Sequence, residues 1–121
     1  MRVMLVDDSS TMRRIEKTQI AAMGISEIIE AENGEEALSM LQDNMPIDVI
    51  FLDWNMPVMN GITFLRKMRE NPKYASVKVI MCTSESEKSR VVEALQAGAH
   101  NFIVKPFTPE VLRERLEKVG K

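Results

Sequence analysis

Short apolar runs rich in β-branched residues recur five times along the chain, and they alternate with longer stretches whose apolar residues recur at helical spacing. Most of these runs are nearly continuous in apolar residues, which is typical of strands in a parallel sheet covered on both faces. They predict strands at Val3–Val6, Glu27–Ala31, Val49–Leu52, Val77–Cys82 and Phe102–Val104.

The stretches that follow these runs predict helices. The first helix is expected over Ser10–Met23, with a buried face formed by Met12, Ile15, Ala22 and Met23. Gly24 then supplies a stop signal, because glycine readily adopts the left-handed conformation that ends many helices. Glycine, proline and capping residues bound the other helices, which are expected after Asn33-Gly34, from Gly61 to Asn71-Pro72, over Glu87–Ala97 before Gly98, and from Thr108-Pro109.

Strand and helix alternate throughout, and this order predicts an α/β fold with a parallel sheet, right-handed crossovers and helices on both faces. The 121 residues contain no linker and no repeat. We therefore expect a single domain over residues 1–121, without an output domain. In open sheets of this kind, ligands bind outside the carboxyl ends of the strands, so the residues after each strand are the candidates for function.

Composition narrows the classes of protein that fit. With 45% hydrophobic and 28% charged residues the chain is expected to be globular, and no apolar run approaches the ~18 residues of a membrane helix. The net charge of −2 gives no reason to expect nucleic acid as a partner. Cys82 is the only cysteine, so no internal disulfide can form. Without an export signal, the expected location is the reducing cytoplasm.

Charged and hydroxyl side chains follow four of the predicted strands, namely Asp7 and Asp8, Asp53, Thr83 and Lys105. If the first and third strands are neighbours, three carboxylates crowd one crevice and repel one another unless a cation neutralises them. An all-oxygen donor set suits a hard ion such as Mg²⁺, with Mn²⁺ as its substitute. Lys105 and Thr83 would complete a cradle for a phosphoryl group, which a carboxylate can accept as an aspartyl-phosphate.

This constellation resembles the receiver domain of two-component response regulators, and the resemblance covers essentially the whole chain. It is carried by Asp7-Asp8, Asp53-x-x-Met56-Pro57-x-Met59-x-Gly61, Thr83 and Gly98-Ala99 with Lys105-Pro106. The stretches Ser10–Arg14 and Asp53–Pro57 are most similar to the stand-alone chemotaxis regulators of that family. The resemblance implies a doubly wound, flavodoxin-like sheet of five parallel strands in the order 2-1-3-4-5 with five helices.

The resemblance also implies roles for individual residues. Asp53 would accept a phosphoryl group from a kinase phosphohistidine. Asp8 and Asp53, with the backbone carbonyl of Asn55, would bind Mg²⁺ directly, and Asp7 would bind it through water. Lys105 would grip the phosphoryl oxygens, and its bond to Pro106 would be cis.

Three further roles concern switching and reversal. Thr83 would move toward the phosphoryl group, and the ring of Phe102 would turn inward. Phe102 stands where the chemotaxis subfamily usually has tyrosine, so the ring is kept and a hydroxyl is lost. Asn55 and Glu85 occupy positions that tune the rate of dephosphorylation in that family, so the resemblance implies the same role for them.

The implied function is a phosphorylation-dependent binding switch that catalyses its own phosphorylation and dephosphorylation and is no metabolic enzyme. The implied partners are a histidine kinase of the CheA-like type, a flagellar motor switch protein or other signalling target, and a phosphatase. Neither nucleic acid nor membrane insertion is expected.

Three other functions compete with this one. A phosphorelay intermediate or phosphate sink would use the same site. An aspartyl-nucleophile phosphatase of the haloacid dehalogenase type needs a second aspartate where this chain has Asn55. A flavodoxin-like FMN carrier is disfavoured because Asp7-Asp8 would repel the ribityl phosphate.

The remaining candidates are expected to be structural. We expect Cys82 to be a buried strand residue, His100 to be solvated, and Met56 and Met59 to pack the loop after Asp53. Trp54 is expected to be exposed beside Asp53, where it would report on metal and phosphate.

Overall fold

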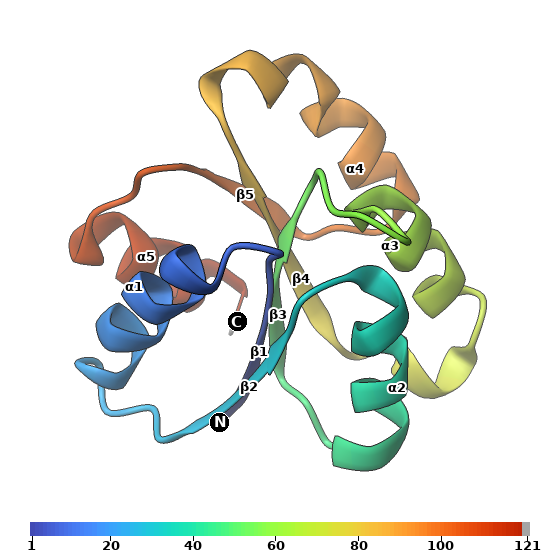
Figure 1. The fold of residues 1–121 in the computed structure, drawn as a ribbon, viewed down its shortest axis with the longest axis horizontal. Helices are drawn as coiled ribbons and strands as arrows, with labels where there is room; N and C mark the ends of the chain where they lie inside the picture. Colours follow the sequence, from blue (N-terminus) through green and yellow to red (C-terminus); the bar gives the residue numbers. More distant parts are fainter. Residues whose placement is uncertain (120–121) are drawn as a thin grey trace.

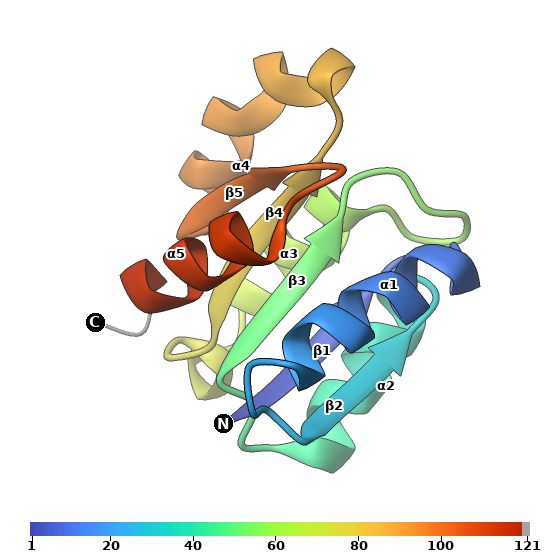
Figure 2. The ribbon, with the colours of Figure 1, turned by 90° about the vertical axis from the view of Figure 1, so that its left-hand side faces the viewer.

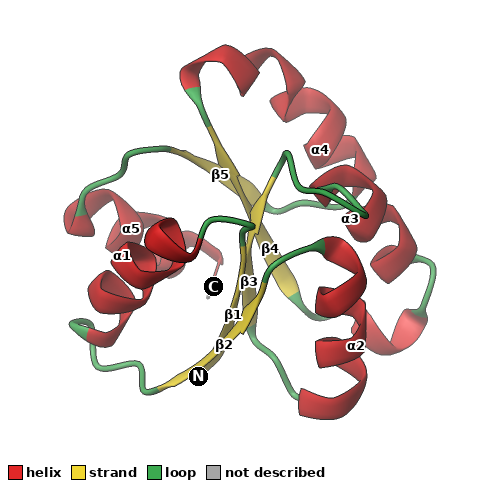
Figure 3. Cartoon of the chain, viewed as in Figure 1, coloured by secondary structure: helices red, strands yellow, loops and turns green. Residues whose placement is uncertain are grey.

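The computed structural model of the chain describes residues 1–119, and at 85 and 86 it describes the backbone alone. Strands and helices alternate as predicted (Figures 1 and 3). In chain order the elements are β1 (Arg2–Val6), α1 (Ser10–Ala21), β2 (Glu27–Ala31), α2 (Gly34–Asn44), β3 (Val49–Asp53), α3 (Gly61–Arg69), the 3₁₀ turn η1 (Pro72–Tyr74), β4 (Lys78–Thr83), the 3₁₀ turn η2 (Glu85–Arg90), α4 (Val91–Ala97), β5 (Asn101–Val104) and α5 (Pro109–Val119).

The five strands form one parallel sheet in the order β2-β1-β3-β4-β5, which confirms the predicted fold class. The register aligns the carboxyl ends of the inner strands, since Val6 pairs with Leu52 and Asp53 pairs with Cys82. Residues directly after β1, β3, β4 and β5 therefore emerge at one edge of the sheet.

Helices cover both faces of the sheet. Figures 1 and 2 show α1 and α5 on one face and α2, α3 and α4 on the other. Alternate residues of each strand enter opposite cores: Met4 and Val6 pack under α2 and α3, whereas Val3 and Leu5 pack under α1 and α5. Among the described residues, no helix is both long enough and apolar enough to cross a membrane.

The buried face of α1 differs from the prediction. Ile15 is 46% exposed and Ala22 is also exposed, whereas Glu16 and Ile20 are buried. The side chain of Ser9 caps the helix by accepting a hydrogen bond from Met12 N. From that start, residues spaced by four positions share the stripe that faces the sheet, and Ile15 lies outside it.

Trp54 is the second correction, because it is 3% exposed and belongs to the core under α2, α3 and α4. It continues the face of Ile50 and Leu52 by the two-residue period of a strand, so its ring turns inward. The guanidinium group of Arg90 lies 5.6 Å from the ring centroid. The predictions for Cys82, which is buried, and His100, which is exposed, are confirmed.

The predicted helix over Glu87–Ala97 is regular only from Val91 onward. Its first part is the 3₁₀ turn η2, which starts after Ser84. Backbone N–H of Ser84 donates to Glu87 Oε1 at 2.9 Å, and Glu87 N donates to Ser84 O at 3.0 Å. These two hydrogen bonds satisfy the backbone N–H groups of Ser84 and Glu87 within one tight turn at the start of η2.

Candidate functional site

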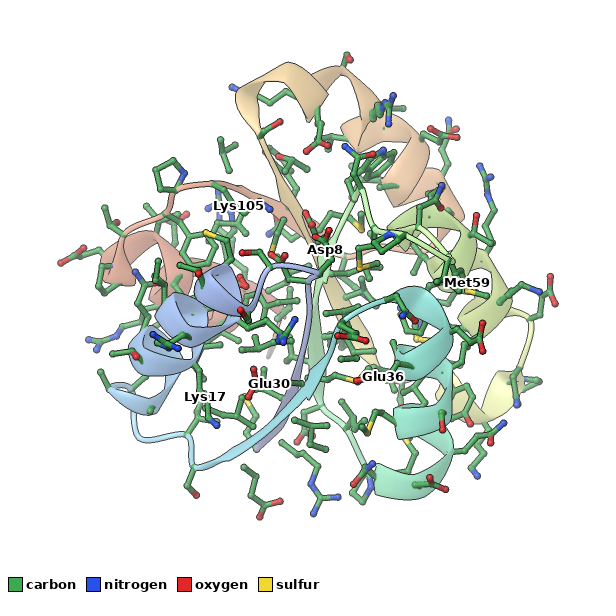
Figure 4. All side chains as sticks on the ribbon, viewed as in Figure 1. Asp8, Lys17, Glu30, Glu36, Met59 and Lys105 are labelled. Carbon is green, nitrogen blue, oxygen red and sulfur yellow. The ribbon has the colours of Figure 1, made fainter. Side chains whose placement is uncertain are left out.

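Three carboxylates converge at the carboxyl edge of the sheet. Asp7 and Asp8 follow β1 and Asp53 ends the neighbouring β3, so one oxygen from each lies within 4.8 Å of the others. Asp7 and Asp53 are buried and Asp8 is exposed. Figure 4 labels Asp8 at this edge of the sheet. Unpaired carboxylates this close repel one another, so the cluster is suited to a cation.

Asp7 is held in place by local hydrogen bonds. Its Oδ1 accepts from Ser9 N at 2.8 Å, and its backbone N–H donates to Ala31 O at 3.1 Å. Its Oδ2 is buried without a hydrogen-bond partner in the described part of the chain. An unsatisfied buried carboxylate oxygen is costly, and a metal ion or a metal-bound water at this position would satisfy it. The donor set therefore fits a hard divalent cation.

Lys105 reaches the same point from the end of β5 (Figure 4). Its Nζ lies 2.8 Å from Asp53 Oδ1 and 3.7 Å from Asp7 Oδ2. Its backbone N–H donates to Thr83 O at 2.7 Å, and the bond to Pro106 is cis, as predicted. Burial would lower the pKa of Lys105, but the hydrogen bond from its ammonium group to Asp53 and the nearby carboxylates raise it overall.

Two opposing effects act on the pKa of the Asp53 carboxyl group. Burial raises its pKa, while the hydrogen bond and positive charge of Lys105 lower it; the net direction is upward in the absence of a metal ion. A cation beside Asp53 would favour the ionised form, which is the nucleophilic one.

Thr83 ends β4 beside this cluster and is completely buried. Its hydroxyl oxygen has no hydrogen-bond partner among the residues that the structure describes. A buried hydroxyl without a partner is a donor available to a new acceptor at the site.

Close packing against the backbone of Asp53 explains why the motif after Asp53 has a glycine at Gly61. Its backbone N–H donates to Trp54 O at 3.0 Å. A Cβ at this position would lie 2.1 Å from the carbonyl oxygen of Asp53, so any larger residue would displace the backbone that carries the acidic side chain. Within the same loop, Val58 has φ of 68° and is 76% exposed, a strained conformation for a β-branched residue.

The remaining predicted site residues are Phe102, the switch residue, and Asn55 and Glu85, the rate-tuning residues. Asn55 is exposed, and its side-chain amide donates to Glu87 Oε2. Phe102 is half-buried under the guanidinium group of Arg115, whose Nε donates to Phe102 O at 2.8 Å. The side chain of Glu85, the other predicted rate-tuning residue, lies outside the described residues.

Sequence reasoning missed Glu16. Its side chain is 2% exposed and its Oε2 has no hydrogen-bond partner within residues 1–119 as described. Burial and the negative charge of Asp7 raise the pKa of Glu16 to about 8. The available signal was its position four residues after Met12 and four before Ile20, on the stripe that faces the sheet.

Sequence reasoning also missed Glu87 as a site residue. The spacing Ser84-x-x-Glu87 is that of a capping box and could have placed the Glu87 carboxylate at the start of the segment. Its second contact, with Asn55, joins loops that are far apart in the sequence and required the tertiary structure.

Comparisons with known proteins point to one family. The family model of the response regulator receiver domain matches residues 3–117. A chemotaxis protein CheY homolog of Campylobacter jejuni is 49% identical over 98% of this chain and 92% of its own length. Chemotaxis protein CheY1 of Helicobacter pylori is 47% identical over 98% of this chain and 96% of its own length. The solved structure of chemotaxis response regulator CheY4 of Vibrio cholerae has a TM-score of 0.88 at 36% identity and covers 98% of this chain and 97% of that one. The chain therefore belongs to the response regulator receiver domain family.

Proposed function

We propose that this chain is a chemotaxis response regulator in which Asp53 accepts a phosphoryl group from the phosphohistidine of a histidine kinase. The observation that carries the proposal is the convergence of Asp7, Asp8 and Asp53 with the ammonium group of Lys105 2.8 Å from Asp53 Oδ1. The close relationship to chemotaxis regulators supports the assignment of the pathway.

The metal ion in this proposal is Mg²⁺. Asp8 and Asp53, together with the backbone carbonyl of Asn55, would hold it directly. Asp7 Oδ2, which has no hydrogen-bond partner among the described residues, would hold one of its waters. When bound, it would neutralise negative charge on the phosphoryl oxygens and on the carboxylates.

In the transfer step, a carboxylate oxygen of Asp53 attacks phosphorus and forms the new P–O bond. The P–N bond to the kinase histidine breaks, and its electron pair stays on the imidazole nitrogen. Lys105 turns its ammonium group from the Asp53 carboxylate to a phosphoryl oxygen. The hydroxyl of Thr83, which has no hydrogen-bond partner in the described part of the chain, donates to another phosphoryl oxygen. Both groups therefore stabilise negative charge that the substrate brings to the site.

The structural change that follows phosphorylation would begin at Thr83. A shift of this hydroxyl toward the phosphoryl group would free space for the ring of Phe102, which is half-buried at the next strand. The surface formed by α4, β5 and α5 would then change its affinity for a signalling target, such as a flagellar motor component. The protein would shift between two conformations, one before and one after these movements. To shift their populations, the phosphoryl group must favour the second conformation by a few kcal/mol.

The direct test is the intact mass of the protein after incubation with acetyl phosphate and Mg²⁺. One added phosphoryl group is expected on the wild type, none on Asp53→Asn, and none on the wild type after the metal is chelated. Incubation with beryllofluoride, monitored by Trp54 fluorescence, checks whether a protein without a stable adduct still binds a phosphoryl mimic. Absence of both signals would contradict the proposal.

A further inference from the structure

The 3₁₀ turn η2 contacts the two residues that follow Asp53. Glu87 accepts a hydrogen bond from the side-chain amide of Asn55, and the guanidinium group of Arg90 lies 5.6 Å from the ring centroid of Trp54. Because β3 and β4 are neighbours in the sheet, these contacts span the gap between the loops that leave them. The two loops carry Asp53 and Thr83 at their bases and so form one rim of the site.

Glu87 uses both of its carboxylate oxygens in this arrangement. Oε1 accepts from the backbone N–H of Ser84 at 2.9 Å, and Oε2 accepts from Asn55 Nδ2. Ser84 directly follows Thr83, and Asn55 lies two residues after Asp53. The side chain of Glu87 therefore connects the residue directly after the predicted switch residue with the residue two positions after the predicted phosphoacceptor.

We infer that Glu87 is a positioning residue that holds Asn55 across the rim of the site and thereby slows the reaction of Asp53 with small phosphodonors and the hydrolysis of its phosphorylated form. The inference rests on the proposed function and adds a regulatory residue to it. The physical basis is the hydrogen bond from Asn55 to Glu87. Because its acceptor is charged, this bond restrains an exposed amide that would otherwise rotate freely at the mouth of the site.

In the hydrolysis that Asn55 would limit, a water oxygen forms the new bond to phosphorus. The bond between phosphorus and the Asp53 oxygen breaks, its electron pair returns to the carboxylate, and a water proton passes to the departing phosphate or to solvent. This attack must come from the side opposite Asp53, so the loops at the mouth control the approach of the water. Releasing the Asn55 side chain from Glu87 would therefore open the path of the attacking water.

The experiment is a double-mutant cycle with Glu87→Ala and Asn55→Ala. Phosphorylation by acetyl phosphate with Mg²⁺ and decay after donor removal are followed by intact mass. If Glu87 acts by holding Asn55, Glu87→Ala speeds both reactions about threefold to tenfold in the wild-type background. It has no further effect in the Asn55→Ala background, because the restrained group is already gone.

Glu87→Gln is the conservative variant. Gln keeps one acceptor oxygen and loses the other, so it is expected to fall between wild type and Glu87→Ala. Glu93→Ala is the matched control, because Glu93 is an exposed carboxylate on α4 that pairs with Arg66 at 3.1 Å, away from the site. It should leave both rates unchanged.

A second readout does not depend on phosphorylation. The side-chain amide resonances of Asn55, identified by their loss in Asn55→Ala, should move toward the position of a free amide in Glu87→Ala and stay in place in Glu93→Ala. An equal rate effect of Glu87→Ala in both backgrounds would mean that its charge alone acts, and would overturn the inference. Unmoved amide resonances would overturn it as well. A wild type that neither takes up a phosphoryl group nor responds to beryllofluoride would instead overturn the proposed function, and the rate-controlling role of Glu87 with it.

Discussion

The ammonium group of Lys105 lies 2.8 Å from Oδ1 of Asp53, although 52 residues and one intervening strand separate them. Their side chains are 19% and 9% exposed, so the ion pair is well shielded from water. Lys105 also lies 3.7 Å from Asp7 Oδ2, which makes it a positive charge shared by two carboxylates. This relationship determines the electrostatic balance of the metal-free site.

Lys105→Met should therefore leave the buried carboxylates uncompensated. Without metal, we expect the free energy of unfolding to fall by about 1–3 kcal/mol, because a buried charge loses its partner. Mg²⁺ should recover most of this loss by taking over the neutralisation. Denaturant unfolding with and without Mg²⁺ measures both effects. Lys118→Met, at an exposed lysine on α5, is the control, and an equal response of the two variants to Mg²⁺ would contradict this prediction.

Asp8 is the exposed member of the acidic cluster, and Asp8→Asn should separate repulsion from metal binding. Without metal, the variant should be as stable as the wild type or more stable, because one of three like charges is gone. With Mg²⁺ at 100 times its dissociation constant, the wild type should gain about 2.7 kcal/mol and the variant clearly less. Thermal unfolding over a Mg²⁺ series tests this, with Asp43→Asn at an exposed position of α2 as the control. A wild type without any response to Mg²⁺ would contradict the assignment of the cluster.

Glu16 should make the stability of the protein depend on pH. Its pKa is about 8 in the folded state against an ordinary value of 4.5, so between these values the folded chain binds more protons than the unfolded chain. The free energy of unfolding should therefore fall as pH rises through this window and level off above it. Glu16→Gln should abolish this component and be more stable than the wild type near pH 9 by an amount on the order of 5 kcal/mol.

Denaturant unfolding of both proteins from pH 5 to pH 9 measures this difference, which cancels contributions from groups that the two share. Glu117→Gln, at an exposed position of α5, should run parallel to the wild type. Parallel curves for Glu16→Gln and the wild type would show that the Glu16 carboxyl is not perturbed.

Thr83→Val keeps the shape of the side chain and removes its hydroxyl. Because the hydroxyl oxygen is buried without a partner in the described part of the chain, the unphosphorylated variant should be more stable by about 1 kcal/mol. The same change should weaken the response to phosphorylation, since a donor to the phosphoryl oxygens is lost. Unfolding in denaturant gives the first quantity, and the change in Trp54 fluorescence on adding beryllofluoride gives the second. A variant that is destabilised while its beryllofluoride response is intact would contradict the role of Thr83.

Helix phase and loop contacts are the features that local patterns predict poorly. The buried face of α1 includes Glu16 and leaves out Ile15, although hydrophobicity alone suggests the opposite. The stripe of α1 that faces the sheet is set by the cap of the helix and by its packing on other elements, including Val3 and Leu5 of β1. The bridge from Asn55 to Glu87 likewise joins residues 32 positions apart.

Local patterns in the sequence were enough to predict the alternation of strands and helices and the residues that follow the strands. Apolar period and turn residues are local signals, and a parallel sheet necessarily brings the carboxyl ends of its strands to one edge. Together with the strand order that the family resemblance implies, this was enough to predict that Asp7, Asp8, Asp53, Thr83 and Lys105 belong to one site. The folded structure was needed to show that Trp54 is buried, that Glu16 is buried near the site, and that Asn55 donates a hydrogen bond to Glu87. These outcomes depend on packing between elements distant in the chain, which no local pattern encodes.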